Sequence, residues 1–520
     1  MVVETRKPNP SSELIMAGFI SDKARQVIPR WRTLRETLRR RELDSVVPTR
    51  AYQTGAPDFL AQKLIDWKQH QTVGHASDLV GAGVALGREG EVTGAARFLL
   101  LDDVYAPSWA RELAVHALDA PENGEIVAPK PAAMEAPYLH GQVRSLRQRL
   151  RIEPRDPILW VELSRVYAIL GLGEQAGRCM SIALQLATTN RFVLRSACRL
   201  FVHLGDPERA HGILARSDRT PHDPWLLAAE IAVGSIAEKR PKLIKPARRM
   251  VSGGKFANSH ISELASALAT LELGSGSLRK SKKLFKLSLA DPTENSIAQA
   301  AWTSWREKSI HFQGSGLLPF NAFEAQSWIS FQKGDWVQSI DQCKLWQFDQ
   351  PFSSWPSIFG SFIAAIVLED YQTSEWFATT GLRANPTDFM LLNNLAFARV
   401  NLGNMEGASE ALTRAYRSQM SERENVAIQV TRGFLEFQTG DLEVGRRLYS
   451  DALSAAQKLD RQDILLFALT SLYLAMELIM RAGEKGGTEL DKAFQALKQG
   501  RDPIFRVLED RLTKLTTVSK

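Results

Sequence analysis

The stretch PILWVELSRVYAILGLGEQAGRCMSIALQLA, residues 157–187, decides the fold. Its first half places four residues on one face of a helix, namely Trp160, Leu163, Ser164 and Tyr167. Gly171 and Gly173 then interrupt the helical pattern, and a second helical face follows with Ala176, Met180 and Ala183. Small residues such as Ser164 and Ala176 are expected where the two helix backbones approach closely. The stretch therefore predicts two helices joined by a glycine turn.

The same unit recurs along the chain. Six glycine turns each follow one apolar helical stretch and precede another: Gly90, Gly173, Gly205, Gly334, Gly403 and Gly440. Their spacings include 32 residues (173 to 205), 69 (334 to 403) and 37 (403 to 440). Spacings near 34 residues, or twice that, are typical of a solenoid of helix-turn-helix repeats, in which each unit packs only on its neighbours.

In their order, the residues of 157–187 resemble the tetratricopeptide repeat (TPR) pattern of Trp, Leu, Gly and Tyr followed by Ala, Phe and Ala. The resemblance implies an all-α fold, a right-handed superhelical solenoid of TPR-like helix-turn-helix repeats over about residues 70 to 480. TPR-like proteins act mainly as protein-binding scaffolds, so the resemblance also implies that role. Many first-helix aromatics of the pattern are missing, which leaves the repeat count open.

The chain divides into six predicted segments. Residues 119–137 form the clearest linker, because they contain Pro121, Pro129, Pro131 and Pro137. The six segments are a basic lead with an amphipathic helix (1–70), a first TPR-like segment (71–118), the Pro-rich linker (119–137), an array with basic runs (138–310), a C-terminal array (320–480) and a capping helix or tail (481–520).

Residues 27–44 are predicted to form an arginine-rich amphipathic helix. Val27, Trp31, Leu34 and Leu38 share one face, and arginines that include Arg30, Arg32, Arg35 and Arg39 cover most of the remainder. Two compatible interpretations stay open. The helix caps the first repeat with its apolar face, or it docks an acidic partner through Arg35 and Arg39.

The net charge of +7 is concentrated in a few runs. Besides the N-terminal run, residues 239–255 hold seven basic residues and residues 279–286 hold five, and neither run contains an acid. The candidate anion-binding residues are Lys239, Arg240, Arg248, Arg249, Lys280 and Lys283. Two interpretations stay open: the runs are a solvated face of the repeats with a flexible loop around Pro241 and Pro246, or they bind an anionic partner, which would be nucleic acid, an acidic protein segment or an anionic membrane.

Composition excludes several classes. A hydrophobic content of 44% with 24% charged residues fits a soluble folded protein. Cys179, Cys198 and Cys343 are expected to be buried as small apolar residues, which favours a cytoplasmic protein without a disulfide framework or a cysteine metal site. The apolar stretch 464–476 is short for a membrane span and is predicted to be a buried helix.

No catalytic motif stands out, so we expect neither enzyme activity nor a cofactor. The Arg-x4-His spacing of Arg111 and His116 resembles that of HEPN-type ribonucleases, but 65 basic residues produce such pairs by chance. An active site within the first 140 residues is the least favoured hypothesis.

Protein binding is the favoured function. Asn394 lies where the peptide-carboxylate clamps of TPR domains place an asparagine. The following repeat presents apolar residues, among them Phe434 and Phe437, so an apolar groove fits better than a carboxylate clamp. The candidate protein-binding residues are Asn394, Phe397, Phe434, Phe437, Trp328, Trp336 and Trp346. The sequence predicts a non-enzymatic scaffold or adaptor that binds another protein on its concave surface. The alternative is a nucleic-acid-associated regulatory subunit that uses the basic runs.

Overall fold

A computed structural model describes residues 28–34, 59–86, 88–119, 136–239, 241–307, 322–416, 421–458, 464–481, 483, 487–500 and 502–518. Within these residues every regular element is helical, and no strand occurs. The elements in chain order are α3 (Phe59–Gln69), α4 (Val73–Leu86), η3 (Glu89–Glu91), α5 (Thr93–Leu99), α6 (Ser108–Asp119), α7 (Ala136–Ile152), α8 (Pro157–Ile169), α9 (Gly173–Leu186), α10 (Arg191–His203), α11 (Pro207–Arg216), η5 (Thr220–His222), α12 (Pro224–Ile236), α13 (Ile244–Ser252), α14 (Asn258–Gly274), α15 (Leu278–Ser288), α16 (Glu294–Arg306), α17 (Phe323–Lys333), α18 (Trp336–Asp349), α19 (Trp355–Phe362), η6 (Ile363–Val367), α20 (Tyr371–Ala384), α21 (Phe389–Asn401), α22 (Met405–Ala415), α23 (Glu422–Thr439), α24 (Leu442–Lys458), α25 (Ile464–Arg481), α26 (Thr488–Gln499) and α27 (Pro503–Val518).

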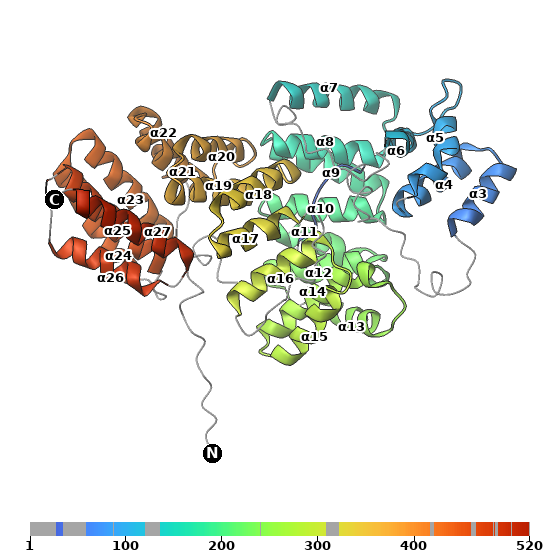
Figure 1. Cartoon of the computed structure of the whole chain (residues 1–520). Helices are drawn as coiled ribbons and strands as arrows, with labels where there is room; N and C mark the ends of the chain where they lie inside the picture. Colours follow the sequence, from blue (N-terminus) through green and yellow to red (C-terminus); the bar gives the residue numbers. More distant parts are fainter. Residues whose placement is uncertain are drawn as a thin grey trace, which may run out of the picture.

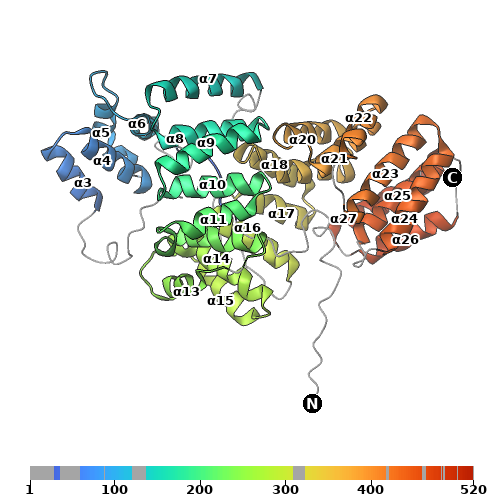
Figure 2. The ribbon, with the colours of Figure 1, turned by 180° about the vertical axis from the view of Figure 1, so that it is seen from behind.

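The helices form pairs that stack one on the next, as the TPR-like repeat predicts (Figures 1 and 2). Helix starts are fixed by side-chain caps, in which an Asp or Asn oxygen accepts a hydrogen bond from a backbone N–H two or three residues on. Such caps begin α8, α10, α11, α12, α18, α20, α21 and α22. The TPR-like all-α solenoid is thereby confirmed, while its right-handedness stays a prediction.

Small residues join the two helices of a repeat, as predicted from Ser164 and Ala176. The Ser164 hydroxyl donates to the Ala176 carbonyl oxygen at 2.8 Å, and both residues are fully buried. The same link recurs between Ser339 and the Ser327 carbonyl at 2.8 Å. A larger side chain at these positions would separate the backbones, so the serines set the close approach of each pair.

The turn glycines match the prediction in four of the six positions. Gly205, Gly334, Gly403 and Gly440 have φ between +76° and +99°, which favours glycine. In the unit at 157–187 the left-handed residue is Gly171, with φ +73°, while Gly173 begins α9. Gly90 lies in the short 3-10 helix η3 and has no positive φ.

The solenoid turns back on itself in its middle. Helix α20 contacts α8, although more than 180 residues separate their first residues. At this contact a Cβ atom on Gly171 would lie only 2.4 Å from the carbonyl oxygen of Arg383. Phe352 and Ala384 belong to the same buried cluster as the apolar residues of α8 and α10. The repeats from α8 to α20 therefore form one closed turn, and Figures 1 and 2 show α18 beside the α8–α10 layer from both sides.

The core consists mainly of three clusters of buried apolar residues. The first lies within residues 60–117, the second draws on residues 31–233 together with Phe352 and Ala384, and the third lies within residues 302–512. Cys179, Cys198 and Cys343 are buried, as predicted. The apolar stretch 464–476 lies in α25, whose Leu465, Ala468 and Leu472 are at most 4% exposed. Among the described helices, none combines the length and apolarity that crossing a membrane requires.

The prediction of an N-terminal helix over residues 27–44 is wrong for residues 28–33. Residues 28–33 are not helical, and Trp31 is 1% exposed. Arg30 and Arg32, predicted on the polar face of that helix, are buried too. The physical reason is that their charges pair with carboxylates of distant repeats. Residues 120–135 of the predicted linker, together with Arg35, Arg39 and Arg240, lie outside the described residues.

The predicted C-terminal capping helix is two helices, α26 and α27. Their apolar residues Leu497, Phe505, Leu508 and Leu512 are at most 3% exposed and belong to the large C-terminal cluster. That these two helices cap the apolar end of the stack stays a prediction.

Candidate protein-binding sites

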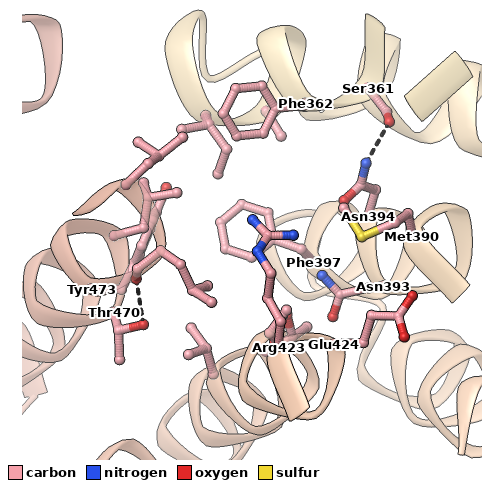
Figure 3. A pocket seen from close by; sticks show the side chains of 18 residues that line it. Ser361, Phe362, Met390, Asn393, Asn394, Phe397, Arg423, Glu424, Thr470 and Tyr473 are labelled. Atoms are coloured by element: carbon pink, nitrogen blue, oxygen red, sulfur yellow. Dashed lines mark hydrogen bonds between the residues drawn. The ribbon is translucent and has the colours of Figure 1, made fainter. Parts of the chain in front are cut away.

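An apolar pocket of about 110 Å³ lies in the C-terminal array (Figure 3). It is lined from five helical elements, which contribute Ser361 and Phe362 from α19; Ala365 and Ile366 from η6; Met390, Asn393, Asn394 and Phe397 from α21; Arg423, Glu424, Ala427, Val430 and Thr431 from α23; and Leu465, Leu466, Leu469, Thr470 and Tyr473 from α25. Helices α21, α23 and α25 are the first helices of successive repeats and contact one another in order, α21 with α23 and α23 with α25. Repetition therefore places their like faces side by side and builds one surface.

Aromatic rings form the base of this pocket. Phe397 stacks on Phe434 with ring centroids 5.3 Å apart, and the Tyr473 ring meets Phe397 edge-on at 5.2 Å. Phe434 and Tyr473 are 4% and 6% exposed. Rings that pack against one another and are almost fully buried are held in place without a ligand. The base of the pocket is therefore preformed.

Two of the polar residues that line the pocket are asparagines. The side-chain N–H of Asn394 donates to the Ser361 hydroxyl at 2.8 Å and points across the repeat boundary (Figure 3). The carbonyl oxygen of the Asn393 side chain is buried and accepts no hydrogen bond from the described residues. A buried acceptor without a donor typically costs about 1–3 kcal/mol. Figure 3 also shows Arg423 extending toward the pocket.

A buried carboxyl lies next to the pocket, one helical turn after Tyr473. Glu477 is 1% exposed and accepts hydrogen bonds from the Gln438 amide at 3.1 and 3.3 Å. Burial raises the pKa of Glu477 from 4.5 to about 7, against the opposing effects of Arg481 and of the Gln438 hydrogen bond. Burial, followed by the charge of Glu477, raises the pKa of Tyr449.

The raised pKa predicts a pH-dependent effect of Glu477→Gln. The unfolded chain loses this proton near pH 4.5 and the folded chain near pH 7, so the wild type loses stability as pH rises through that window. Glutamine cannot ionise, so the variant should gain stability relative to wild type between pH 5 and 8, by on the order of 2 kcal/mol. Urea unfolding at both pH values measures this gain. The exposed Glu443→Gln is the control, and an equal difference at both pH values would contradict the assignment.

The structure brings together some of the predicted protein-binding residues and separates others. Asn394 and Phe397 line the pocket, and Phe434 lies beneath it. Phe437 faces away from the pocket, because its ring packs on Tyr449 and fills the space above Gly445.

The three predicted tryptophans lie elsewhere, in α17 and α18. Trp328 is 2% exposed and stacks on Phe359 with centroids 3.8 Å apart, while Trp346 is also 2% exposed. Trp336 is half-buried against Phe331. These side chains pack between helices, where Trp328 and Trp346 contribute to the core rather than to an exposed surface.

The basic runs lie on α13, α15 and the turn before α13. Lys239, Arg248, Arg249, Lys280 and Lys283 are exposed, and α13 and α15 both pack against α14. Arg248 pairs with Glu272 at 2.6 Å and Lys239 with Glu208 at 3.0 Å. Anion binding at these residues stays a prediction.

Sequence reasoning missed two features of these sites. The first is the contribution of α25, through Leu469 and Tyr473, to the pocket. The apolar residues of 464–476 recur every three to four positions and so form a stripe along one helix face. This stripe could have predicted that α25 continues the apolar surface of α21 and α23. The second is the non-helical backbone of residues 28–33 and the burial of Arg30 and Arg32, for which the local pattern holds no signal.

No family model and no curated protein matches this sequence. Among solved structures, the chain is similar to the Cut9–Hcn1 hetero-tetramer of the APC/C, with 13% identity over 94% of this chain and 92% of that chain and a TM-score of 0.44. It is also similar to the human IFIT1 dimer with PPP-AAAA (14% identity, 93% and 99% covered, TM-score 0.32). A third is a tetratricopeptide repeat protein from Parabacteroides merdae (13% identity, 53% and 97% covered, TM-score 0.26).

Proposed function

We propose that this protein is a non-enzymatic scaffold that holds a short apolar segment of a partner protein in the pocket of α21, α23 and α25. The observation that supports this proposal best is the pocket itself, an apolar surface built from successive first helices over a preformed aromatic base. A well-formed apolar pocket with a few polar groups at its edge is the kind of place where proteins bind an apolar group of a partner.

The size of the pocket limits what it accepts. Its volume of about 110 Å³ is somewhat smaller than the roughly 150 Å³ cavity that is known to bind benzene. The pocket therefore suits one bulky apolar side chain, such as Leu, Met or Phe, as the anchor of the segment. Full burial of one such anchor contributes about 1.5–3 kcal/mol to binding.

The substitution Ala427→Arg tests this proposal. Ala427 is partly exposed and lines the pocket, so an arginine there would fill the space of the anchor and add a charge. We expect the affinity for the partner to fall about tenfold to a hundredfold, the equivalent of losing one buried anchor. The matched control is Ala61→Arg, because Ala61 is exposed on α3, outside the pocket.

The measurement is affinity capture of the tagged chain and of both variants from the native cells, with and without nuclease, quantified by mass spectrometry. Support would be a stoichiometric protein partner that survives nuclease, is retained by Ala61→Arg and is depleted by Ala427→Arg. Equal capture by the two variants would contradict the pocket as the binding site. Partners that are lost on nuclease treatment would favour the nucleic-acid-associated alternative.

A further inference from the structure

Residues 28–34, Ile-Pro-Arg-Trp-Arg-Thr-Leu, lie inside the closed turn of the solenoid, and we call them the inner segment. In Figures 1 and 2 they form a short dark blue stretch among the green helices. Their backbone is not helical from 28 to 33. Trp31 is 1% exposed, and its ring meets that of Phe352 edge-on at 5.3 Å. The inner segment is thus packed into the core, far in sequence from most of what it contacts.

Three carboxylates from three successive helices surround the two arginines of the inner segment. Glu294 begins α16, Glu324 lies in α17 and Asp349 ends α18, and we call these residues the acidic cluster. The Arg32 guanidinium bonds both Asp349 oxygens at 2.7 and 2.8 Å and also bonds Glu294. Arg30 reaches Glu324 at 3.1 Å and Asp349 at 3.4 Å. All five side chains are at most 8% exposed.

The main chain of the inner segment is also bound. The Trp31 N–H donates to the Gln350 side chain at 3.2 Å, and the Leu34 N–H donates to Glu162 at 2.7 Å. Arg165 of α8 donates to the Trp31 carbonyl at 3.3 Å. Side chains of the solenoid therefore bond the N–H and the carbonyl of Trp31, and they also bond the side chains of the two flanking arginines. Proteins that bind an extended peptide likewise combine main-chain hydrogen bonds, which give affinity, with side-chain contacts, which give specificity.

The acidic cluster is unfavourable without a cation. Three buried carboxylates around one site repel one another, and each is costly to remove from water unless it is paired. Planar guanidinium groups bond carboxylates in a bidentate manner, as Arg32 does with Asp349. The chemistry of this surface therefore selects a segment with arginines on both sides of an aromatic residue.

We propose that the interior of the closed turn is a peptide-binding site selective for extended Arg-aromatic-Arg segments, and that residues 28–34 occupy it in cis. The site is separate from the pocket of α21, α23 and α25 and does not depend on its function. The inner segment contacts α8, which begins the closed turn, and the acidic cluster of α16, α17 and α18 in its second half, so its binding links these two parts of the turn.

The test is binding of a fluorescently labelled, end-blocked peptide, IPRWRTL, to the full chain. Wild type should not bind it, since the site is occupied. The full-length double variant Arg30→Ala, Arg32→Ala should take up the peptide in trans and be stabilised by it, because a ligand that binds only the folded state raises the melting temperature. A peptide with glutamates in place of both arginines should bind at least about tenfold more weakly, since like charges are then buried together.

A second variant covers the case in which the double alanine chain does not fold. Arg30→Lys, Arg32→Lys keeps both charges but loses the bidentate geometry, so it should fold and exchange its inner segment for the arginine peptide. Adding Asp349→Asn to this variant should weaken peptide uptake. Failure of both variants to bind IPRWRTL, or equal binding of the glutamate peptide, would overturn the proposal and leave residues 28–34 as a structural part of the core only.

Discussion

The substitution Arg32→Ala should lower the free energy of unfolding by about 3–5 kcal/mol, the cost of leaving buried charges without their partner. Arg32 is 1% exposed and bonds Asp349 through two nitrogens as well as Glu294. Removing it takes one of two guanidinium groups away from the three buried carboxylates of the acidic cluster. Urea unfolding, followed by circular dichroism of the helices, measures the loss.

An exposed arginine pair provides the control for Arg32. Arg178 pairs with Glu174 four residues earlier on α9, and both side chains are more than 70% exposed. Such a pair is worth only about 0.2–1 kcal/mol, so Arg178→Ala should barely move the unfolding midpoint. Equal effects of Arg32→Ala and Arg178→Ala would show that Arg32 is not buried among carboxylates.

The substitution Gly171→Ala should destabilise the chain by about 3 kcal/mol. The φ of +73° costs an alanine about 1–2 kcal/mol at this position. The added Cβ atom would also lie 2.4 Å from the Arg383 carbonyl oxygen, a main-chain atom of α20 that cannot turn aside. Overpacking of this kind typically costs a further 1–3 kcal/mol or so, because α8 and α20 must separate.

Gly205 separates these two contributions. Its φ of +76° is almost the same as that of Gly171, but a Cβ atom there would meet no atom within 4 Å. Gly205→Ala should therefore cost only the backbone term. The extra loss in Gly171→Ala, measured by urea unfolding of both variants, reports the closure of the turn between α8 and α20. Equal losses would contradict that closure.

The repeats could be predicted from the sequence because their determinants are local. The pattern of 157–187 fixes two helices, a turn and the close approach of Ser164 to Ala176, all within about one repeat. Each copy repeats the same short-range choices, so errors at single positions, such as Gly90, do not change the architecture. The contact between α8 and α20 that closes the turn could not be predicted in this way. It depends on the small rotation between neighbouring repeats, which accumulates over many repeats.

The inner segment shows where local reasoning fails. The spacing of Trp31, Leu34 and Leu38 is helical, but the side-chain bonds of Arg30 and Arg32 reach residues about 260 to 320 positions away, and the bond to the Trp31 carbonyl comes from 134 positions away. Tertiary ion pairs and the burial of Trp31 outweigh the helical propensity of a few residues, which amounts to less than about 1 kcal/mol each.

The candidate pocket was predictable in part. Asn394 and Phe397 followed from their first-helix positions, and repetition carried the surface on to α23. The face of Phe437 was not predictable, because Phe434 and Phe437 are three residues apart on one broad apolar stripe. The direction of the Phe437 ring is decided by Gly445 on the facing helix, because a Cβ atom there would lie 2.7 Å from the ring. That glycine makes room for Phe437 between α23 and α24.

The position of residues 28–34 inside the closed turn is tested most directly by amide hydrogen exchange at Trp31 and Leu34. Both N–H groups donate to buried side chains of the solenoid, at 3.2 and 2.7 Å. We expect them to exchange as slowly as the amides of α8, through opening of the whole turn rather than by local fraying. Exchange at the rate of an unstructured peptide would contradict the buried inner segment and the binding site built around it.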